Sequence, residues 1–347
     1  MTLSLRQFAY FVALMIMFGW LLHVGKPVLL PVLIAMIALY ILSNVTDRLG
    51  AMPLIGRLPA TLRRFMVLAA FTVVLVLLVL YVAETFTQVA TVLPRYDSNL
   101  DALATQLGLL MHLEDEPTWA TVRAATIDQF QIQSYIGPIL ASVRGFGGTL
   151  FLVVLYAAFF MAERARMAEK LALAIGDPGR ESRTLALLAR INARVGNYLS
   201  VKTVVNVVLG AISFGILLLF GIDFALFWAI LIGFLNYIPY IGSMVAVIFP
   251  VLLGLAQFGD LGTAALLALG LTAAQMFVAG VLEPRMMGRA FNLSPFVVLF
   301  ALAFWSALWG IPGAVLAVPL TASLIIVLGE INATRPIAIM LSASGRI

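Results

Sequence analysis

The sequence contains no cysteine, two histidines and few charged residues, since Asp, Glu, Lys and Arg make up only 11% of its 347 positions. Soluble domains carry about a quarter. The absence of cysteine excludes disulfides, thiolate metal sites and thiol nucleophiles. Hydrophobic residues account for 63% of the chain. This balance is typical of a membrane protein and argues against metalloenzymes and thiol-redox enzymes.

Common catalytic motifs are also missing. The chain has no Gly-x-x-x-x-Gly-Lys-Ser/Thr phosphate loop and no His-Glu-x-x-His zinc motif. No apolar run has a carboxylate near its centre, whereas intramembrane aspartyl proteolysis needs two. Ser243 has no plausible histidine base, because His23 and His112 are expected outside the membrane core. We therefore expect no enzyme activity, cofactor, metal ion or nucleic-acid partner.

Long uncharged apolar runs are numerous, and a bilayer core of about 30 Å needs roughly 20 helical residues. Two runs, 224–258 and 293–329, are too long for one span, and each is broken by a turn rich in Pro and Gly. They predict helical hairpins, either broken or re-entrant. The remaining runs are 8–23, 28–43, 65–82, 147–162, 203–222 and 261–282. The predicted fold is an all-α polytopic membrane protein with about eight membrane segments, two of them C-terminal hairpins, and an external helical segment.

The distribution of Lys and Arg predicts the orientation. With the N-terminus in the cytoplasm and each hairpin returning to its own side, 17 of the 21 Lys and Arg residues lie inside and four outside. Both termini are therefore predicted to be cytoplasmic. The predicted organisation is N-terminal membrane helices (1–86), an extracytoplasmic helical segment (87–146), a membrane helix (147–162), basic amphipathic helices in the cytoplasm or at the interface (163–202), a C-terminal transport core (203–330) and a cytoplasmic tail (331–347).

The external segment has apolar residues at helical spacing from Val89 to Leu110. A second helix is predicted to start at Asp115-Glu116-Pro117, where acids and proline suit a first turn. About sixty residues make a thin independent core. We expect this segment to rest on the membrane part or on a neighbouring subunit.

Polar and helix-breaking residues at membrane depth are expensive, so they mark pathways or interfaces. The first hairpin contains such a break, whose first arm is too short for a full crossing. Broken helices offer free backbone groups to substrates in transporters. The predicted substrate pathway comprises Asn206, Asn236, Tyr237, Pro239, Tyr240, Gly242 and Gln275. The alternatives are an ordinary loop with interfacial tyrosines and, for Asn206 and Gln275, amides that hold helices together.

Glu283 and Arg285 flank a proline at the inner end of the run 261–282. They could pair with a neighbouring segment and serve gating or coupling. The alternative is an ordinary solvated helix end.

These stretches resemble the autoinducer-2 exporter (AI-2E) family of bacterial inner-membrane proteins. The order and spacing fit over about residues 190–330. The matching stretches are Asn236-Tyr237-Ile238-Pro239-Tyr240-Ile241-Gly242, Glu283-Pro284-Arg285 with Gly288, Leu293-Ser294-Pro295, Phe304-Trp305-Ser306-Ala307-Leu308-Trp309-Gly310 with Gly313, and Leu316-Ala317-Val318-Pro319-Leu320-Thr321.

The resemblance implies a multi-pass inner-membrane transporter, with some members linked to export of the furanone autoinducer-2, a quorum-sensing signal, and others to sodium/proton antiport. It also implies a homo-oligomer in the bilayer, with a pentamer as one form. We expect export of a small polar solute. One alternative is a cation/proton antiporter, although Asp223, Asp260 and Glu283 all lie at predicted span ends. The other is a membrane scaffold that transports nothing, which would leave the polar helix breaks without a use.

Overall fold

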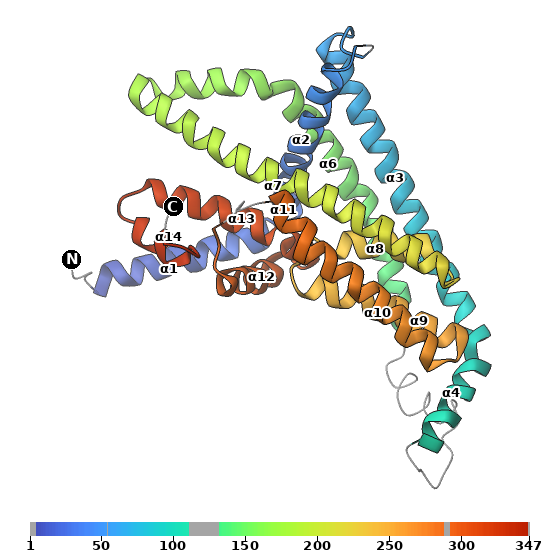
Figure 1. Cartoon of the computed structure of the whole chain (residues 1–347). Helices are drawn as coiled ribbons and strands as arrows, with labels where there is room; N and C mark the ends of the chain where they lie inside the picture. Colours follow the sequence, from blue (N-terminus) through green and yellow to red (C-terminus); the bar gives the residue numbers. More distant parts are fainter. Residues whose placement is uncertain (1–4, 54, 111–131, 288–291, 346–347) are drawn as a thin grey trace. The chain divides into compact units, whose positions relative to one another are not determined.

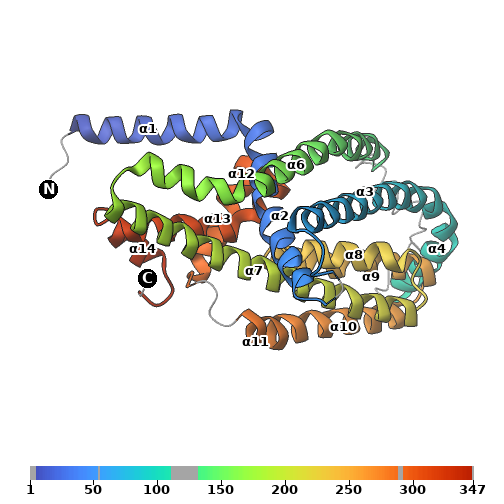
Figure 2. The same cartoon turned by 90° about the horizontal axis from the view of Figure 1, so that it is seen from above.

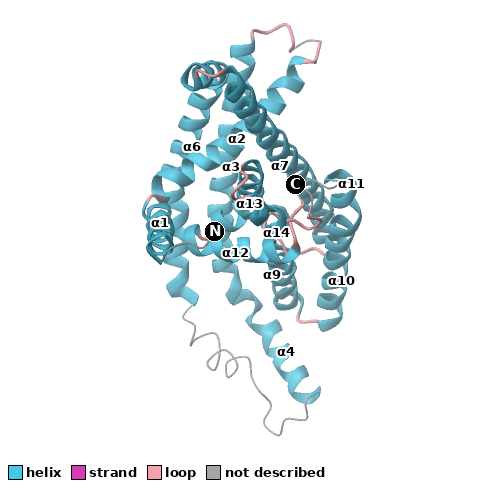
Figure 3. Cartoon of the chain, turned by 90° about the vertical axis from the view of Figure 1, so that its left-hand side faces the viewer, coloured by secondary structure: helices cyan, strands magenta, loops and turns pink. Residues whose placement is uncertain are grey.

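The computed structural model describes residues 5–53, 55–110, 132–287 and 292–345, and in these ranges the chain is helical without a β-strand (Figures 1 and 3). The all-α prediction is confirmed. The elements are α1 (Leu5–Val24), α2 (Lys26–Gly50), α3 (Ala60–Val92), the 3-10 helix η1 (Leu93–Tyr96), α4 (Asp97–Leu110), α6 (Ile132–Ile175), α7 (Pro178–Leu219), α8 (Ala225–Leu235), α9 (Ile241–Phe258), α10 (Leu261–Phe277), the π-helix η2 (Val278–Leu282), α11 (Glu283–Met287), α12 (Pro295–Trp309), α13 (Ile311–Glu330) and α14 (Arg335–Leu341).

Six helical segments in the described ranges are long and apolar enough to cross a bilayer. In the span Ala60–Val89 only 6% of the most apolar window is buried inside the protein. Large side chains such as Val73, Leu77 and Leu80 are exposed there. In water such a surface would be strongly unfavourable, whereas lipid tails solvate it. The protein is therefore a multi-pass membrane protein.

The chain divides into two compact units. The first comprises Met1–Ala69, Gly148–Ser200 and Arg289–Ile347, and the second Ala70–Gly147 and Val201–Gly288. In the second unit α9 packs against α8 and α10 (Figure 2). Its core is built from buried side chains of η1, α7, α8, α9, α10 and η2. In the first unit α13 packs against α12 and α14.

Both predicted hairpins are present as helix pairs, α8–α9 and α12–α13. The α8 arm has 11 residues, or about 17 Å at 1.5 Å per residue. It cannot cross a bilayer core of about 30 Å by itself. The first arm of this hairpin is thus even shorter than the sequence suggested.

Three predicted boundaries fall inside continuous helices. α6 runs through 146/147 and 162/163, and α7 runs through 202/203. The basic segment 163–202 is therefore formed by extensions of the two adjoining helices. The predicted break between them is present, because α6 ends at Ile175, Gly176 has a φ of +66°, and α7 begins at Pro178. Positive φ suits glycine, which has no Cβ to clash.

The first part of the segment that was predicted to be external is helical, with α3 continuing into η1 and α4. Tyr96 Oη donates a hydrogen bond to Asp223 Oδ2 (2.6 Å), and Asn99 Nδ2 donates one to the carbonyl of Gln257 (2.6 Å). Burial and the bond to Asp223 raise the pKa of Tyr96. Within the second unit, these contacts dock η1 and α4 onto the α7–α8 connection and the end of α9. The helix predicted after Pro117 lies outside the described residues.

Candidate functional site

A buried pair of amides joins α7 to the end of α8. Asn236 Nδ2 donates to Asn206 Oδ1 at 2.8 Å, and both side chains are buried. The helices approach closely here because Gly233 has no side chain: a Cβ at this position would lie 2.9 Å from the backbone oxygen of Asn206. Small residues commonly allow such contacts in membranes, where interhelical hydrogen bonds add to packing.

A second polar contact lies next to the amide pair. The hydroxyls of Tyr237 and Thr203 share a hydrogen bond of 2.7 Å. Thr203 is three residues before Asn206 on α7, so the two residues lie on neighbouring positions of one helix face. Asn236 and Tyr237, adjacent in the hairpin turn, are therefore both fixed to α7 by side-chain hydrogen bonds.

The turn itself has an unusual backbone. Tyr240 has φ +62° and ψ −61°, and the N–H of Ile241 donates to the carbonyl of Pro239 at 2.7 Å. This is a γ-turn of the positive-φ type, which is rare and strained for a residue other than glycine. Gly242 follows it, and a Cβ there would lie 1.8 Å from the backbone oxygen of Leu235. The turn is closed so tightly that position 242 requires glycine.

Buried hydrogen-bond donors in the second unit lack a protein acceptor within the described ranges. They are Asn206 Nδ2, Gln275 Nε2 and Trp228 Nε1. All three residues are at most 8% exposed. An unmet donor in a low-dielectric interior is costly, so these atoms are places where a polar ligand or water would be bound favourably.

A partly buried ion pair lies one helical turn before Asn206 on α7. Lys202 Nζ donates to both carboxylate oxygens of Glu283 at 2.9 Å. Glu283 directly follows η2, and its N–H bonds to the carbonyl of Val278. Helices of the π type are frequent at functional sites. Arg285, two residues further on, is exposed and forms no ion pair with any described residue.

The structure brings some of the predicted residues together and separates others. Asn206, Asn236 and Tyr237 form one cluster, whereas Tyr240 is 58% exposed. Gln275 is buried on α10, and no hydrogen bond within the described chain links it to the amide pair. Of the predicted gating pair, only Glu283 meets a neighbouring segment.

Sequence reasoning missed Lys202, Thr203 and Gly233. Lys202 was assigned to the cytoplasmic helices because it precedes the apolar run 203–222. The sequence did contain a signal for the pairing of Lys202 with Glu283. Lys202 directly precedes the apolar run 203–222, and Glu283 directly follows the run 261–282. Because the predicted topology makes these two spans antiparallel, the two opposite charges lie at the same side of the membrane.

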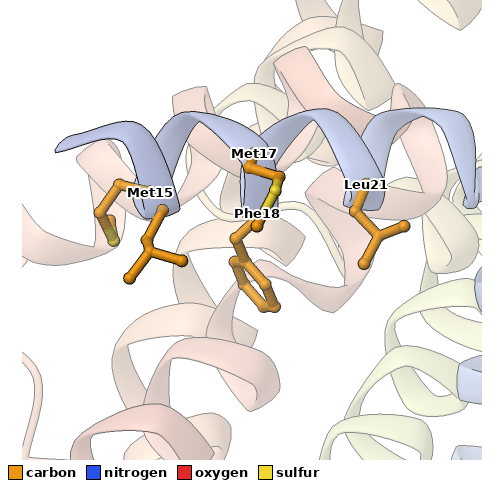
Figure 4. Close-up of a pocket in the computed structure, with 5 residues that line it drawn as sticks. Met15, Met17, Phe18 and Leu21 are labelled. Carbon is orange, nitrogen blue, oxygen red and sulfur yellow. The ribbon is translucent and has the colours of Figure 1, made fainter. Parts of the chain in front are cut away.

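A separate hollow of about 360 Å³ lies along α1 (Figure 4). Its lining consists of Leu14, Met15, Met17, Phe18 and Leu21. These side chains offer no hydrogen-bonding group comparable to the amides of the second unit. A polar ligand is not expected there, and lipid contact accounts for the surface.

The profile of the AI-2E family transporters matches residues 10–333. The chain belongs to the AI-2E transporter family. A protein named "Putative transport protein" from Haemophilus influenzae is 30% identical over 91% of this chain and 89% of its own length. One of the same name from Borreliella burgdorferi is 33% identical over 64% of this chain and 63% of its own length.

An AI-2E relative with a more specific name, "AI-2 transport protein TqsA" of Escherichia coli, is 28% identical over 82% of both chains. Membership confirms the resemblance noted in the sequence and makes this chain a member of a transporter family. The family match spans both hairpins and the α7 segment that carries Lys202 and Asn206.

Proposed function

We propose that this AI-2E protein exports a small, uncharged polar solute from bacteria across the inner membrane, with autoinducer-2 as the first candidate. The observation that carries the proposal is the buried Asn206–Asn236 pair at the break of the α8–α9 hairpin, where Asn206 Nδ2 remains without an acceptor. The name of the relative TqsA supports the choice of autoinducer-2, a signal in quorum sensing.

The chemistry around the break suits a neutral solute rich in oxygen acceptors. The unmet groups of Asn206, Gln275 and Trp228 are all N–H donors. Hydroxyl, ether and carbonyl oxygens of a solute would satisfy them. The neighbouring charges of Lys202 and Glu283 neutralise each other, so the region offers no net charge to attract an ion.

The remaining predicted pathway residues take supporting roles in this proposal. Pro239, Tyr240 and Gly242 hold the strained turn, and a change of its backbone would expose or cover the amides of Asn236 and Asn206. Gln275 lies further along α10 and would contact the solute during passage. Arg285 would contribute to gating as an exposed cation at the end of the same helix.

The arrangement in the cell forms part of the proposal. We place both termini in the cytoplasm, from the distribution of Lys and Arg. We propose a homo-oligomer, with a pentamer as the first form to test. Cross-linking in native membranes, followed by mass measurement of the intact assembly, would determine the subunit number.

The test of transport is efflux of autoinducer-2 from proteoliposomes, with and without an imposed proton gradient. Asn236→Ala and Tyr240→Ala are expected to reduce efflux by about ten-fold or more per folded protein, since a lost interaction of about 1.4 kcal/mol is a factor of ten. Asn99→Ala is the matched control: it removes an amide that bonds to Gln257, away from the turn. Normal efflux in both turn variants would contradict the pathway.

The second candidate is cation/proton antiport. It is favoured by one observation, the carboxylate of Glu283, whose side chain is 25% exposed at the end of a span. Antiport predicts sodium-driven proton movement in the same vesicles, which Glu283→Gln would abolish. Absence of both activities would favour the scaffold.

A further inference from the structure

The ion pair of Lys202 and Glu283 differs from the other ion pairs recorded among the described residues. In the pairs Lys170–Glu163, Arg180–Asp177 and Arg183–Glu330 the cationic side chains are 58%, 84% and 73% exposed. The side chain of Lys202 is 6% exposed. Exposed pairs are screened by water, but a buried ammonium requires a partner. Among the described residues, Glu283 is the ion-pair partner of Lys202.

The geometry is that of a cation seated on a carboxylate. Nζ lies 2.9 Å from Oε1 and 2.9 Å from Oε2, so one positive charge is shared by both oxygens. A small monovalent metal ion bound to a carboxylate prefers the same central position, because it too interacts with both oxygens. Glu283 is the more exposed partner, since its side chain is 25% exposed and that of Lys202 is 6% exposed.

The residues on either side of the pair are fixed by other contacts. Thr203 follows Lys202 directly, and its hydroxyl bonds to that of Tyr237. Glu283 is positioned by η2, in which each turn contains an extra residue. A return of η2 to α-helical register would rotate the following residues by about 100°, the angle per residue in an α-helix. Such a rotation would carry Glu283 away from Lys202, so the pair depends on the π-helical register of η2.

We propose that Lys202 occupies a cation site at Glu283 and takes the place of a coupling ion. The tethered ammonium fills the position that a sodium ion would otherwise hold. This inference rests on the proposed function and adds a coupling mechanism to it. Solute efflux by the wild type is expected to need no external sodium. Lys202 is expected to bind and leave Glu283 as η2 changes register. Removal of the ammonium opens the site to sodium.

The test uses the purified full-length protein and measures its midpoint of thermal unfolding, Tm, in sodium chloride and in choline chloride at equal ionic strength. Lys202→Ala is expected to show a Tm that rises with sodium, by about 1–2 °C at five times the dissociation constant. The wild type, Lys202→Arg and the double variant Lys202→Ala/Glu283→Gln are expected to show no difference between the salts. Arg285→Gln is the matched control for loss of a positive charge near the same carboxylate.

Lys202→Ala leaves a partly buried carboxylate without its ion-pair partner and can fail to fold. Solubilisation in sodium or in choline then becomes the measurement, with Lys202→Gln as a second variant. Folded protein recovered in sodium only would support the cation site. The proposal would be overturned if neither Lys202→Ala nor Lys202→Gln showed a difference in Tm or recovery between sodium and choline. It would also be overturned if sodium raised the Tm of the wild type.

These outcomes are separate from the test of the proposed function, because none of them uses a solute. A protein that exports no autoinducer-2 can still show the sodium response of Lys202→Ala. Conversely, a chain without that response can still export autoinducer-2 through Asn206 and Asn236.

Discussion

The hairpins α8–α9 and α12–α13 share a glycine just after the turn and differ in the side chains around it. Gly242 and Gly313 each face the backbone of the preceding helix: an added Cβ would lie 1.8 Å from the oxygen of Leu235 and 2.0 Å from that of Trp305. Both hairpins thus close by the same means, direct approach of backbone to backbone.

Their hydrogen bonding differs. In α12–α13 the indole of Trp309 donates to the carbonyl of Leu22 on α1, and that of Trp305 donates to Thr321, each at 3.0 Å. Near α8–α9, Trp228 and Asn206 retain unmet donors. Buried donors without a partner are rare and need an explanation, such as a bound ligand or water. Under the proposed function, the first hairpin therefore has a binding role and the second a structural role.

The largest expected effect is common to both hairpins. Gly242→Ala and Gly313→Ala are each expected to destabilise the protein by about 3 kcal/mol or more, because the overlap involves backbone that cannot move aside. The measurement is the yield of monodisperse protein on size-exclusion chromatography, together with Tm. Equal losses in both variants would support the shared design.

Gly215→Ala is the control for these two substitutions. Gly215 lies four residues before the end of α7, and nothing lies within 4 Å of an added Cβ. Alanine there is expected to leave Tm unchanged or raise it, since glycine costs a helix about 0.5–1 kcal/mol relative to alanine. A near-wild-type Gly242→Ala protein would mean that the turn is less tightly closed than described.

The hairpins could be predicted from sequence because length and helix breakers specify them. A run of 35 apolar residues cannot be one span, and the stretch from Asn236 to Gly242 contains both proline and glycine. The amide pair was only partly predictable: Asn206 and Asn236 stood out as polar residues in apolar runs, but their pairing depends on Gly233, whose role requires knowledge of helix packing.

The ion pair of Lys202 could not be predicted from the distribution of Lys and Arg, which placed this residue in the cytoplasmic helices. Counting Lys and Arg in connections places a residue on one side of the membrane, but says nothing about burial. The continuity of α7 through position 202, which brings Lys202 against Glu283, follows from tertiary contacts. The γ-turn at Tyr240 was equally unpredictable, since positive φ at tyrosine opposes local preference.

The second prediction concerns the amide pair of the first hairpin. Asn206→Ala and Asn236→Ala are each expected to lower stability by about 1 kcal/mol, and the double variant to lose less than the sum, with a coupling of about 0.6–1.7 kcal/mol. The Tm values of the wild type, the two single variants and the double variant complete this double-mutant cycle. Additive losses would show that the hydrogen bond contributes nothing to stability and would weaken the contrast with α12–α13.

The third prediction concerns the second hairpin. Trp309→Phe keeps most of the buried ring and removes the bond to Leu22, so stability is expected to fall by about 1 kcal/mol. Efflux per folded protein is expected to remain at the wild-type level, in contrast to Asn236→Ala. A selective loss of efflux in Trp309→Phe would overturn the division into a structural and a binding hairpin.

The smallest effect is expected at the helix caps that adjoin the hairpins. Asp260 caps α10 after the first hairpin, and Ser294 caps α12 at the start of the second. Hydrogen bonds from the side chain and backbone of Thr263 lower the pKa of Asp260. The stabilising effect of this carboxylate is therefore full above its ordinary pKa of about 3.9 and is lost as the pH falls through the lower pKa of the folded state.

Asp260→Ser is expected to remove that part of the acid dependence of Tm, because a hydroxyl caps the helix without titrating in this range. Ser294→Ala is expected to lower Tm equally at every pH. The hydroxyl of Ser294 accepts a hydrogen bond from the N–H of Val297, and its removal changes no charge. Thermal unfolding from about pH 6 to about pH 3 compares the two variants. If the Tm of Asp260→Ser fell with pH as much as that of the wild type, the acid-sensitive contact would lie elsewhere. The two hairpins would then differ in their buried hydrogen-bond donors but not in the pH dependence of their helix caps.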